Sequence, residues 1–337
     1  MTRLDQIYGG LLGGAVGDAM GAATETRSMN QIHEYFGGFV SSMQTPPDDV
    51  FARGFPAGSV TDDFSLAYCT AKAIVEASGR VTQEVAAKAL LTWSQSKFYA
   101  LAGPTTRAAM DQLKGAPTEN ALSFLSVDNA KGSNGGAMKI APVGLCAHGD
   151  VDLAIRNAVL ICLPTHYNSA ALSGACAVAA ATAQALQGGA TVETMIEAAI
   201  KGAEYGEAYG KHHHKELACP SIPKRIRLAV AIANKYKGNL VRVMKELSDL
   251  IGCGLAAAEA VPTAFGILAA SEGDPMRAIV AGVNIGNDTD TIATMAGAMA
   301  GALTGPTDEL LAFGPQMDEV NEMELHALAE AIDQLPM

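Results

Sequence analysis

The chain has 337 residues, of which 49% are hydrophobic and only 5% aromatic, and its formal net charge is −12. This acidic balance, with no basic stripe to offset it, argues against a nucleic-acid-binding protein. A core of Ala, Leu, Ile, Val and Met with few aromatic residues favours packed helices over a sheet.

The composition also argues against a membrane protein and a disulfide scaffold. The N-terminus begins like a signal peptide, but Asp5 lies in the flank of its apolar run and Asp18 interrupts the run, so we expect a cytoplasmic protein. The longest uncharged stretch, residues 169–190, is dominated by Ala and predicts a buried helix rather than a membrane span. The six cysteines show no C-x-x-C pairing, which makes zinc fingers and a disulfide framework poor interpretations.

Helical periodicity recurs along the whole chain, and no segment has the sustained alternation of a sheet strand. Only residues 37–43 favour a short extended piece, and no linker divides the chain. We therefore predict one all-α domain over residues 1–337. The predicted helices span 4–23, 63–78, 82–97, 105–114, 118–126, 138–147, 151–162, 168–187, 191–205, 223–235, 239–249, 255–271, 275–283, 290–303 and 322–334.

Two of the predicted helices begin with a threonine and two acids. Thr61, Asp62 and Asp63 precede one, and Asp288, Asp290 and Thr291 precede the other, in "GNDTDTIATMAGAMAGALTG". Either group alone is typical of a helix N-cap. Together they form an all-oxygen set that suits Mg²⁺, Mn²⁺ or Ca²⁺ and disfavours zinc. An EF-hand is excluded, because Ala293 and Met299 stand where its loop needs Gly and Glu.

The metal interpretation requires the two ends of the chain to meet. Glycines at every fourth residue, at 13, 17 and 21 and again at 297, 301 and 305, would let two helix backbones approach closely. The spacing alone is equally compatible with each stripe packing against some other helix. If the two stripes meet, Asp18 and Glu25 lie near the second acid group.

The chain resembles the ADP-ribosylglycohydrolase family from about residue 5 to about residue 305. The motifs that carry the resemblance occur in the family's order: "GGLLGGAVGDAMGAATE", "GSVTDDFSLA", "SNGGAMKIAPVGL", "THYNSAAL" and "GNDTDTIATMAGAMAGAL". The resemblance implies an all-α orthogonal bundle with a centre of two Mg²⁺ or Mn²⁺ ions at the base of a cleft. The implied substrate is an ADP-ribosylated protein or a small ADP-ribosyl or ribosyl compound.

The resemblance also assigns roles to residues. It implies Thr61, Asp62, Asp63, Asp288, Asp290 and Thr291 as metal ligands, with Glu25 beside the metals. A carboxylate there, Glu25 or Asp62, would serve catalysis as the base that steers the attacking water. The implied substrate-binding residues are Ser133, Asn134, Gly135, Gly136, Met138 and His166.

The loop at residues 133–138 alone is a weak signal, because glycine turns are common between helices. It nevertheless resembles an anion-binding nest at a helix start. Together these features predict a hydrolase that cleaves the glycosidic bond at ribose C1, with metal-held ribose hydroxyls and an activated water.

Two departures from the family pattern leave the leaving group open. Ala102 stands before Gly103 where many members acting on modified proteins have Asp, and Phe64 follows the acid pair where Thr is common. The alternatives are a hydrolase of small N-ribosides and a non-catalytic ADP-ribose-binding module. The intact acid set disfavours the module, and the sequence predicts no oligomeric state.

Overall fold

The computed structural model describes residues 1–115 and 131–336, and within these the secondary structure is helical. The described residues contain no strand, only the isolated bridges Ser28–Gly286, Ser133–Ala256 and Asn168–Lys215. The all-α prediction is therefore confirmed. The helix predicted over residues 118–126 lies outside the described residues.

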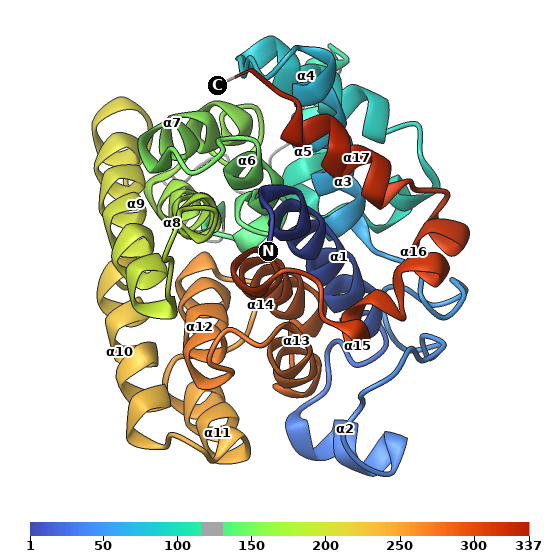
Figure 1. The fold of residues 1–337 in the computed structure, drawn as a ribbon. Coiled ribbons are helices and arrows are strands. Elements are labelled where there is room, and N and C mark those ends of the chain that lie inside the picture. Colours follow the sequence, from blue (N-terminus) through green and yellow to red (C-terminus); the bar gives the residue numbers. More distant parts are fainter. Residues whose placement is uncertain (116–130, 337) are drawn as a thin grey trace.

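Two helices from opposite ends of the sequence form the centre of the bundle (Figure 1). α1 (Arg3–Gly21) and α14 (Thr289–Thr304) run antiparallel, with Gly9 against Gly301 and Gly17 against Ala293. A Cβ atom added to Gly13 would overlap the carbonyl oxygen of Gly297. The two glycine stripes therefore pack against each other, which brings the C-terminal end of α1 to the start of α14.

A second small-residue contact joins α8 (Ser169–Ala185) to α9 (Val192–His213). Added Cβ atoms at Gly202 and Gly206 would overlap the carbonyl oxygens of Cys176 and Leu172. Nearly every residue of α8 is buried, so the Ala-rich stretch is a core helix, as predicted. Where the side chains are this small, backbones can approach closely and dispersion contacts replace bulky side-chain packing.

The remaining helices pack around the central α1–α14 pair, and α9 lies at the left edge of the view (Figure 1). In chain order they are α2 (Met29–Phe36), α3 (Asp62–Glu76), α4 (Gln83–Trp93), η1 (Lys97–Leu101), α5 (Pro104–Leu113), η3 (Asn134–Gly136), α6 (Ala141–Leu145), α7 (Val151–Cys162), α10 (Ile222–Lys235), α11 (Leu240–Leu250), α12 (Ala257–Ala270), α13 (Pro275–Asn284), α15 (Asp308–Leu311), α16 (Gly314–Asn321) and α17 (Leu325–Asp333).

The differences from prediction lie in short or polar elements. α2, α15 and α16 were not predicted, α9 continues eight residues beyond the expected end at 205, and α6 covers only the middle of 138–147. Residues 37–43 form no strand. Instead, the Asn284 side chain accepts from the Val40 N–H and donates to its carbonyl oxygen, both at 2.8 Å. This amide pairs with the backbone as a neighbouring strand would.

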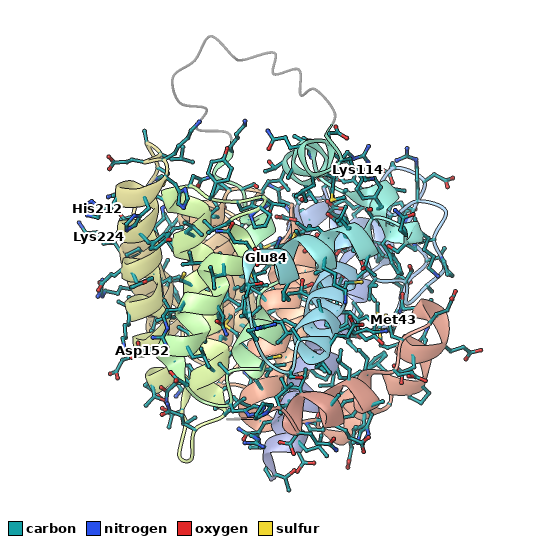
Figure 2. The ribbon with its side chains drawn as sticks, turned by 90° about the horizontal axis from the view of Figure 1, so that it is seen from above. Met43, Glu84, Lys114, Asp152, His212 and Lys224 are labelled. Carbon is teal, nitrogen blue, oxygen red and sulfur yellow. The ribbon has the colours of Figure 1, made fainter. Side chains whose placement is uncertain are left out.

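The charged and histidine-rich segments lie on the outside. His212 and Lys224 project from the edge of the molecule formed by α9 and α10 (Figure 2). Within the described ranges, no helix is long and apolar enough to cross a membrane. The expectation of a cytoplasmic location stays a prediction.

Candidate metal centre

The two acid-rich helix starts meet at the C-terminal end of α1. The Thr291 hydroxyl donates to Asp63 Oδ2 at 2.5 Å, which joins the start of α14 directly to the start of α3. Two backbone hydrogen bonds join the segment after α1 to the segment before α14. Thr26 N donates to Asn287 O, and Asn287 N donates to Arg27 O, each at 2.7 Å. Glu25 is thereby held beside the start of α14.

Asp18 fixes the start of α3 from within α1. Its fully buried carboxylate accepts from the Thr61 N–H (2.9 Å), the Thr61 hydroxyl (2.8 Å) and the Phe64 N–H (2.8 Å). Thr61 in turn caps α3 by accepting from Asp63 N at 3.2 Å. Burial and the Asp290 charge raise the pKa of Asp18 to about 8, against the lowering effect of these hydrogen bonds. The start of α3 is thus capped by Thr61 and held in place by the Asp18 carboxylate.

The start of α14 does not follow the simple capping interpretation. Asp288 occupies the N-cap position, but its side chain makes no cap hydrogen bond. It accepts instead from the Asn134 amide, which belongs to the glycine-rich loop. Asp290 Oδ1 accepts from the Thr291 N–H at 2.9 Å. The Asp288 carboxylate is therefore directed at the site, where it is available to a ligand.

Three carboxylates converge most closely. One oxygen each from Glu25, Asp288 and Asp290 lies within 4.8 Å of the other two, and all three residues are buried. Burial, then the charges of Asp290, Asp288, Asp62 and Asp18, raise the pKa of Glu25 to about 10. Burial, with Asp290 next in importance, also raises the pKa of Asp63 and of Asp288 well above the usual range. Within the part of the chain that the structure describes, no ion pair to a cationic side chain offsets the charges of these acids.

Asp62 lies at the more open side of the group. Burial and the Asp290 charge raise its pKa to about 7, while hydrogen bonding to the Gly103 backbone and the Arg107 charge act in the opposite direction. The segment that departs from the family pattern therefore lies next to Asp62. Ala102 is itself buried there and offers no carboxylate.

This donor set fits a hard divalent cation. All side-chain donors are carboxylate or hydroxyl oxygens, the type that Mg²⁺ and Mn²⁺ prefer. A cation would supply the positive charge that buried, mutually repelling carboxylates need to ionise. The buried acidic group could therefore hold a metal ion.

The glycine-rich loop forms one wall of the site. Asn134 N donates to Leu255 O at 2.9 Å, and an added Cβ at Gly135 would lie 2.7 Å from His166 Nε2. Ser133 precedes the short η3 turn and pairs with Ala256, whereas Met138 is buried behind the loop. The loop does not enter a helix at 138, because α6 begins only at Ala141. His166, almost fully buried, packs against the loop from the side of α8.

Comparison with known proteins gives a consistent result. Residues 1–334 match the ADP-ribosylglycohydrolase family. The chain belongs to this family. It is 29% identical over 342 residues to the uncharacterized protein YegU of Escherichia coli strain K12, covering 98% of this chain and 97% of that protein. It is 30% identical over 331 residues to the ADP-ribosylhydrolase ARH3 of Gallus gallus, covering 88% and 84%.

A solved structure shares the fold. The "ADP-ribosylglycohydrolase-related protein complex" aligns with a TM-score of 0.64 and 22% identity over 99% of each chain. The orthogonal-bundle architecture expected for an ADP-ribosylglycohydrolase is therefore confirmed.

The predicted site residues fall into two neighbouring sets. Thr61, Asp63, Asp288, Asp290 and Thr291 lie with Glu25 around the buried acids, and Asn134 connects them to the loop and His166. The sequence placed Asp18 near the second acid group, as the structure has it, but assigned it no role in the site and did not single out Lys139 or Thr165. An acid inside the apolar, glycine-striped segment was the available signal for Asp18.

Proposed function

We propose that this protein is a metal-dependent hydrolase that cleaves the glycosidic bond at ribose C1 of ADP-ribosylated substrates. The observation that carries the proposal is the convergence of Glu25, Asp288 and Asp290 in a buried cluster joined to the start of α3. A buried cluster of acids is costly without a cation. The family membership supplies the substrate class.

Two Mg²⁺ or Mn²⁺ ions would be held by oxygen ligands from both helix starts. The proposed ligands are Thr61, Asp62, Asp63, Asp288, Asp290 and Thr291. Bound there, the ions would supply charge for holding the ribose hydroxyls and for lowering the pKa of a water. Asp18 would orient Thr61, because it occupies the hydroxyl hydrogen and leaves an oxygen lone pair for the site.

Glu25 is the proposed catalytic base, with Asp62 as its partner at the open side. The Glu25 carboxylate lies beside the ligand acids but belongs to the turn after α1 rather than to either acid-rich helix start. It can therefore accept a proton from a water without being part of those ligand sets. Attack of that water at ribose C1 would pass through a transition state with oxocarbenium character.

The loop from Ser133 to Met138, with His166, is the proposed site for the phosphate and ribose groups. The Asn134 amide donates to Asp288, so the loop is tied to the acid cluster. A substrate held by both would place its ribose between the phosphates and the cations. Positioning of this kind lowers the entropic part of the barrier.

Two candidates are considered for the leaving group, because Ala102 places no acid beside Asp62. The ADP-ribosylhydrolase ARH3 relatives favour an ADP-ribosyl substrate. The runner-up function is hydrolysis of small N-ribosides on the same scaffold. It would not require the loop from Ser133 to Met138.

A hydrolysis screen separates these functions. ADP-ribosyl-arginine, ADP-ribosyl-serine and plain ribonucleosides would be incubated with the protein in Mg²⁺, in Mn²⁺ and in EDTA, and released product measured. We expect ADP-ribose release that depends on the metal. Faster cleavage of ribonucleosides than of both ADP-ribosyl conjugates would establish the runner-up instead.

A further inference from the structure

Lys139 is a buried lysine directly after the glycine-rich loop. Its side chain is among the largest that are fully buried, with 1% exposure. Its Nζ has one hydrogen-bond partner among the described residues, Thr165 Oγ1 at 3.2 Å. A buried amine with a single hydroxyl partner is unfavourable compared with an apolar side chain of similar length. Packing alone therefore does not account for a lysine here.

Thr165 connects this lysine to His166. Its hydroxyl lies 2.8 Å from His166 Nδ1 and 3.2 Å from Lys139 Nζ. Burial lowers the pKa of the Lys139 amine. Its Nζ nevertheless donates to the threonine oxygen, so the single hydroxyl hydrogen is left for Nδ1. The opposite tautomer would place two donors on the threonine oxygen and leave its hydrogen without an acceptor. Nδ1 is therefore the acceptor, and the ring hydrogen lies on Nε2.

His166 Nε2 faces the loop. An added Cβ at Gly135 would lie 2.7 Å from this atom, and the side chain is only 2% exposed. Within residues 1–115 and 131–336, Nε2 makes no hydrogen bond, although Nδ1 is bonded. Burial, and then the Lys139 charge, lower the pKa of His166 to about 3, so the ring is neutral near pH 7. A neutral N–H donor is thus held, unpartnered, against the glycines.

The loop itself is tied to the same turn. Cys162 Sγ lies 3.7 Å from Gly136 O, to which it can donate, and the His166 and Thr165 amides both donate to Cys162 O. The turn that carries Thr165 and His166 follows α7 and contacts the loop through Cys162. A ligand over the glycines would meet Nε2 in a fixed position.

We propose that Lys139 and Thr165 are positioning residues that hold His166 as an Nε2–H donor toward an anionic group, of the diphosphate class, bound over Gly135 and Gly136. The identification of that group as the diphosphate of ADP-ribose rests on the proposed function. The lysine also polarises the chain, because its charge strengthens the donor character of each following hydrogen bond.

The tautomer can be measured without any ligand. Long-range ¹⁵N–¹H correlation spectra of histidine-labelled protein report which ring nitrogen carries the hydrogen, and a His166→Gln spectrum assigns the signal. We expect an unprotonated Nδ1 in the wild type. We expect a mixture of tautomers in Thr165→Val, which keeps the shape but lacks the hydroxyl, and in Lys139→Met. Thr165→Ser should restore the wild-type spectrum.

Calorimetric titration with ADP-ribose in Mg²⁺ tests whether the oriented His166 donor contributes to binding of the diphosphate. We expect Thr165→Val to bind about tenfold more weakly, the effect of losing a well-placed hydrogen bond to a charged group, and Thr165→Ser to bind like the wild type. Thr182→Val is the matched control, because Thr182 is equally buried but donates only to Val178 O within α8.

A wild-type Nδ1 that carries the hydrogen would overturn the proposal. So would a Thr165→Val affinity within twofold of the wild type, or a wild type that does not bind ADP-ribose. A protein that binds ADP-ribose with these tautomer effects but hydrolyses no ADP-ribosyl conjugate would contradict the proposed function and leave this inference standing.

Discussion

Three buried carboxylates lie within 4.8 Å of one another, those of Glu25, Asp288 and Asp290. At the scale of residues, the chemistry of the site depends on what neutralises their charges. Without a cation, burial raises the pKa of all three acids, and repulsion by neighbouring carboxylates raises the pKa of Glu25 and Asp288 further. With a cation, Asp288 and Asp290 would become ligands, and Glu25 would ionise beside them. Their chemistry therefore depends on pH and metal together.

Replacing Glu25 by Gln should slow turnover far more than it weakens binding. Loss of general base catalysis lowers kcat by roughly 10²–10⁴-fold, whereas the loop and the proposed metal ligands stay intact. The measurement is steady-state kinetics on an ADP-ribosyl conjugate with ADP-ribose affinity determined in parallel. Glu84→Gln, in an exposed first helical turn, is the control. An unchanged kcat in Glu25→Gln would remove Glu25 from the mechanism.

Stabilisation by Mg²⁺ should increase as pH rises from 6 to 8. The folded pKa values of Asp62 and Asp18 are about 7 and about 8, above the unfolded value of about 4, so without metal the folded protein holds these protons at pH 6 and loses them toward pH 8. The unfolded chain ionises these acids already near pH ~4, so the stability of the metal-free protein falls until the pH passes the folded pKa values, while protons compete less with the cation.

The readout is the melting temperature in Mg²⁺ minus that in EDTA, at each pH. Titration of groups remote from the site affects both conditions equally and cancels in this difference. A difference that is constant or decreases toward pH 8 would contradict the assignment.

The meeting of the two acid-rich helix starts could be predicted, because hydroxyl and carboxylate residues at two helix starts stand out against apolar helices. The chain from Lys139 through Thr165 to His166 could not be predicted. A lysine beside an apolar segment usually extends to solvent. Only the fold places the Lys139 amine against the Thr165 hydroxyl.

At the scale of elements, the contact between α1 and α14 sets the geometry of the site. Gly9, Gly13 and Gly17 let the backbones approach until Gly21 lies against Asp290. The two helix starts and the turn with Glu25 are therefore positioned by backbone contact rather than by long side chains. Such a contact is stiff, as a metal site requires.

Gly13→Ala should destabilise the protein and weaken metal binding. The new Cβ would overlap the Gly297 carbonyl, and overpacking of this kind costs about 1–3 kcal/mol or more. Gly188→Ala is the control, because nothing lies within 4 Å of an added Cβ there. Urea unfolding of both variants measures the difference, and equal stabilities would show that the helices can separate without cost.

Helices with long apolar repeats were predictable, whereas α2, α15 and α16 were not. Each is eight residues or fewer, so its periodicity covers about two turns at most. The polar C-terminal end of α9 was missed for a related reason, because glycines and charged residues interrupt the apolar pattern after residue 205 while the helix continues to His213.

At the scale of the whole molecule, the first and last parts of the sequence form one structure. The Arg3 guanidinium Nε lies 2.6 Å from an Asp333 carboxylate oxygen, and α1 packs antiparallel against α14 along its length. The spacing of glycines predicted close helix contacts but could not identify the partners, because any two small-residue stripes are compatible. The prediction of a single domain over residues 1–337 agrees with this closure and stays a prediction.

The central claim is that the two acid-rich helix starts form one divalent-cation site, and direct titration with Mn²⁺ tests it. Binding would be followed by electron paramagnetic resonance or calorimetry, without substrate, in the wild type and in Asp288→Asn/Asp290→Asn. We predict two ions bound per wild-type chain, none bound at this site in the double variant, and a folded helical spectrum in both. A wild type that binds no Mn²⁺, or a double variant that binds it equally well, would contradict the account.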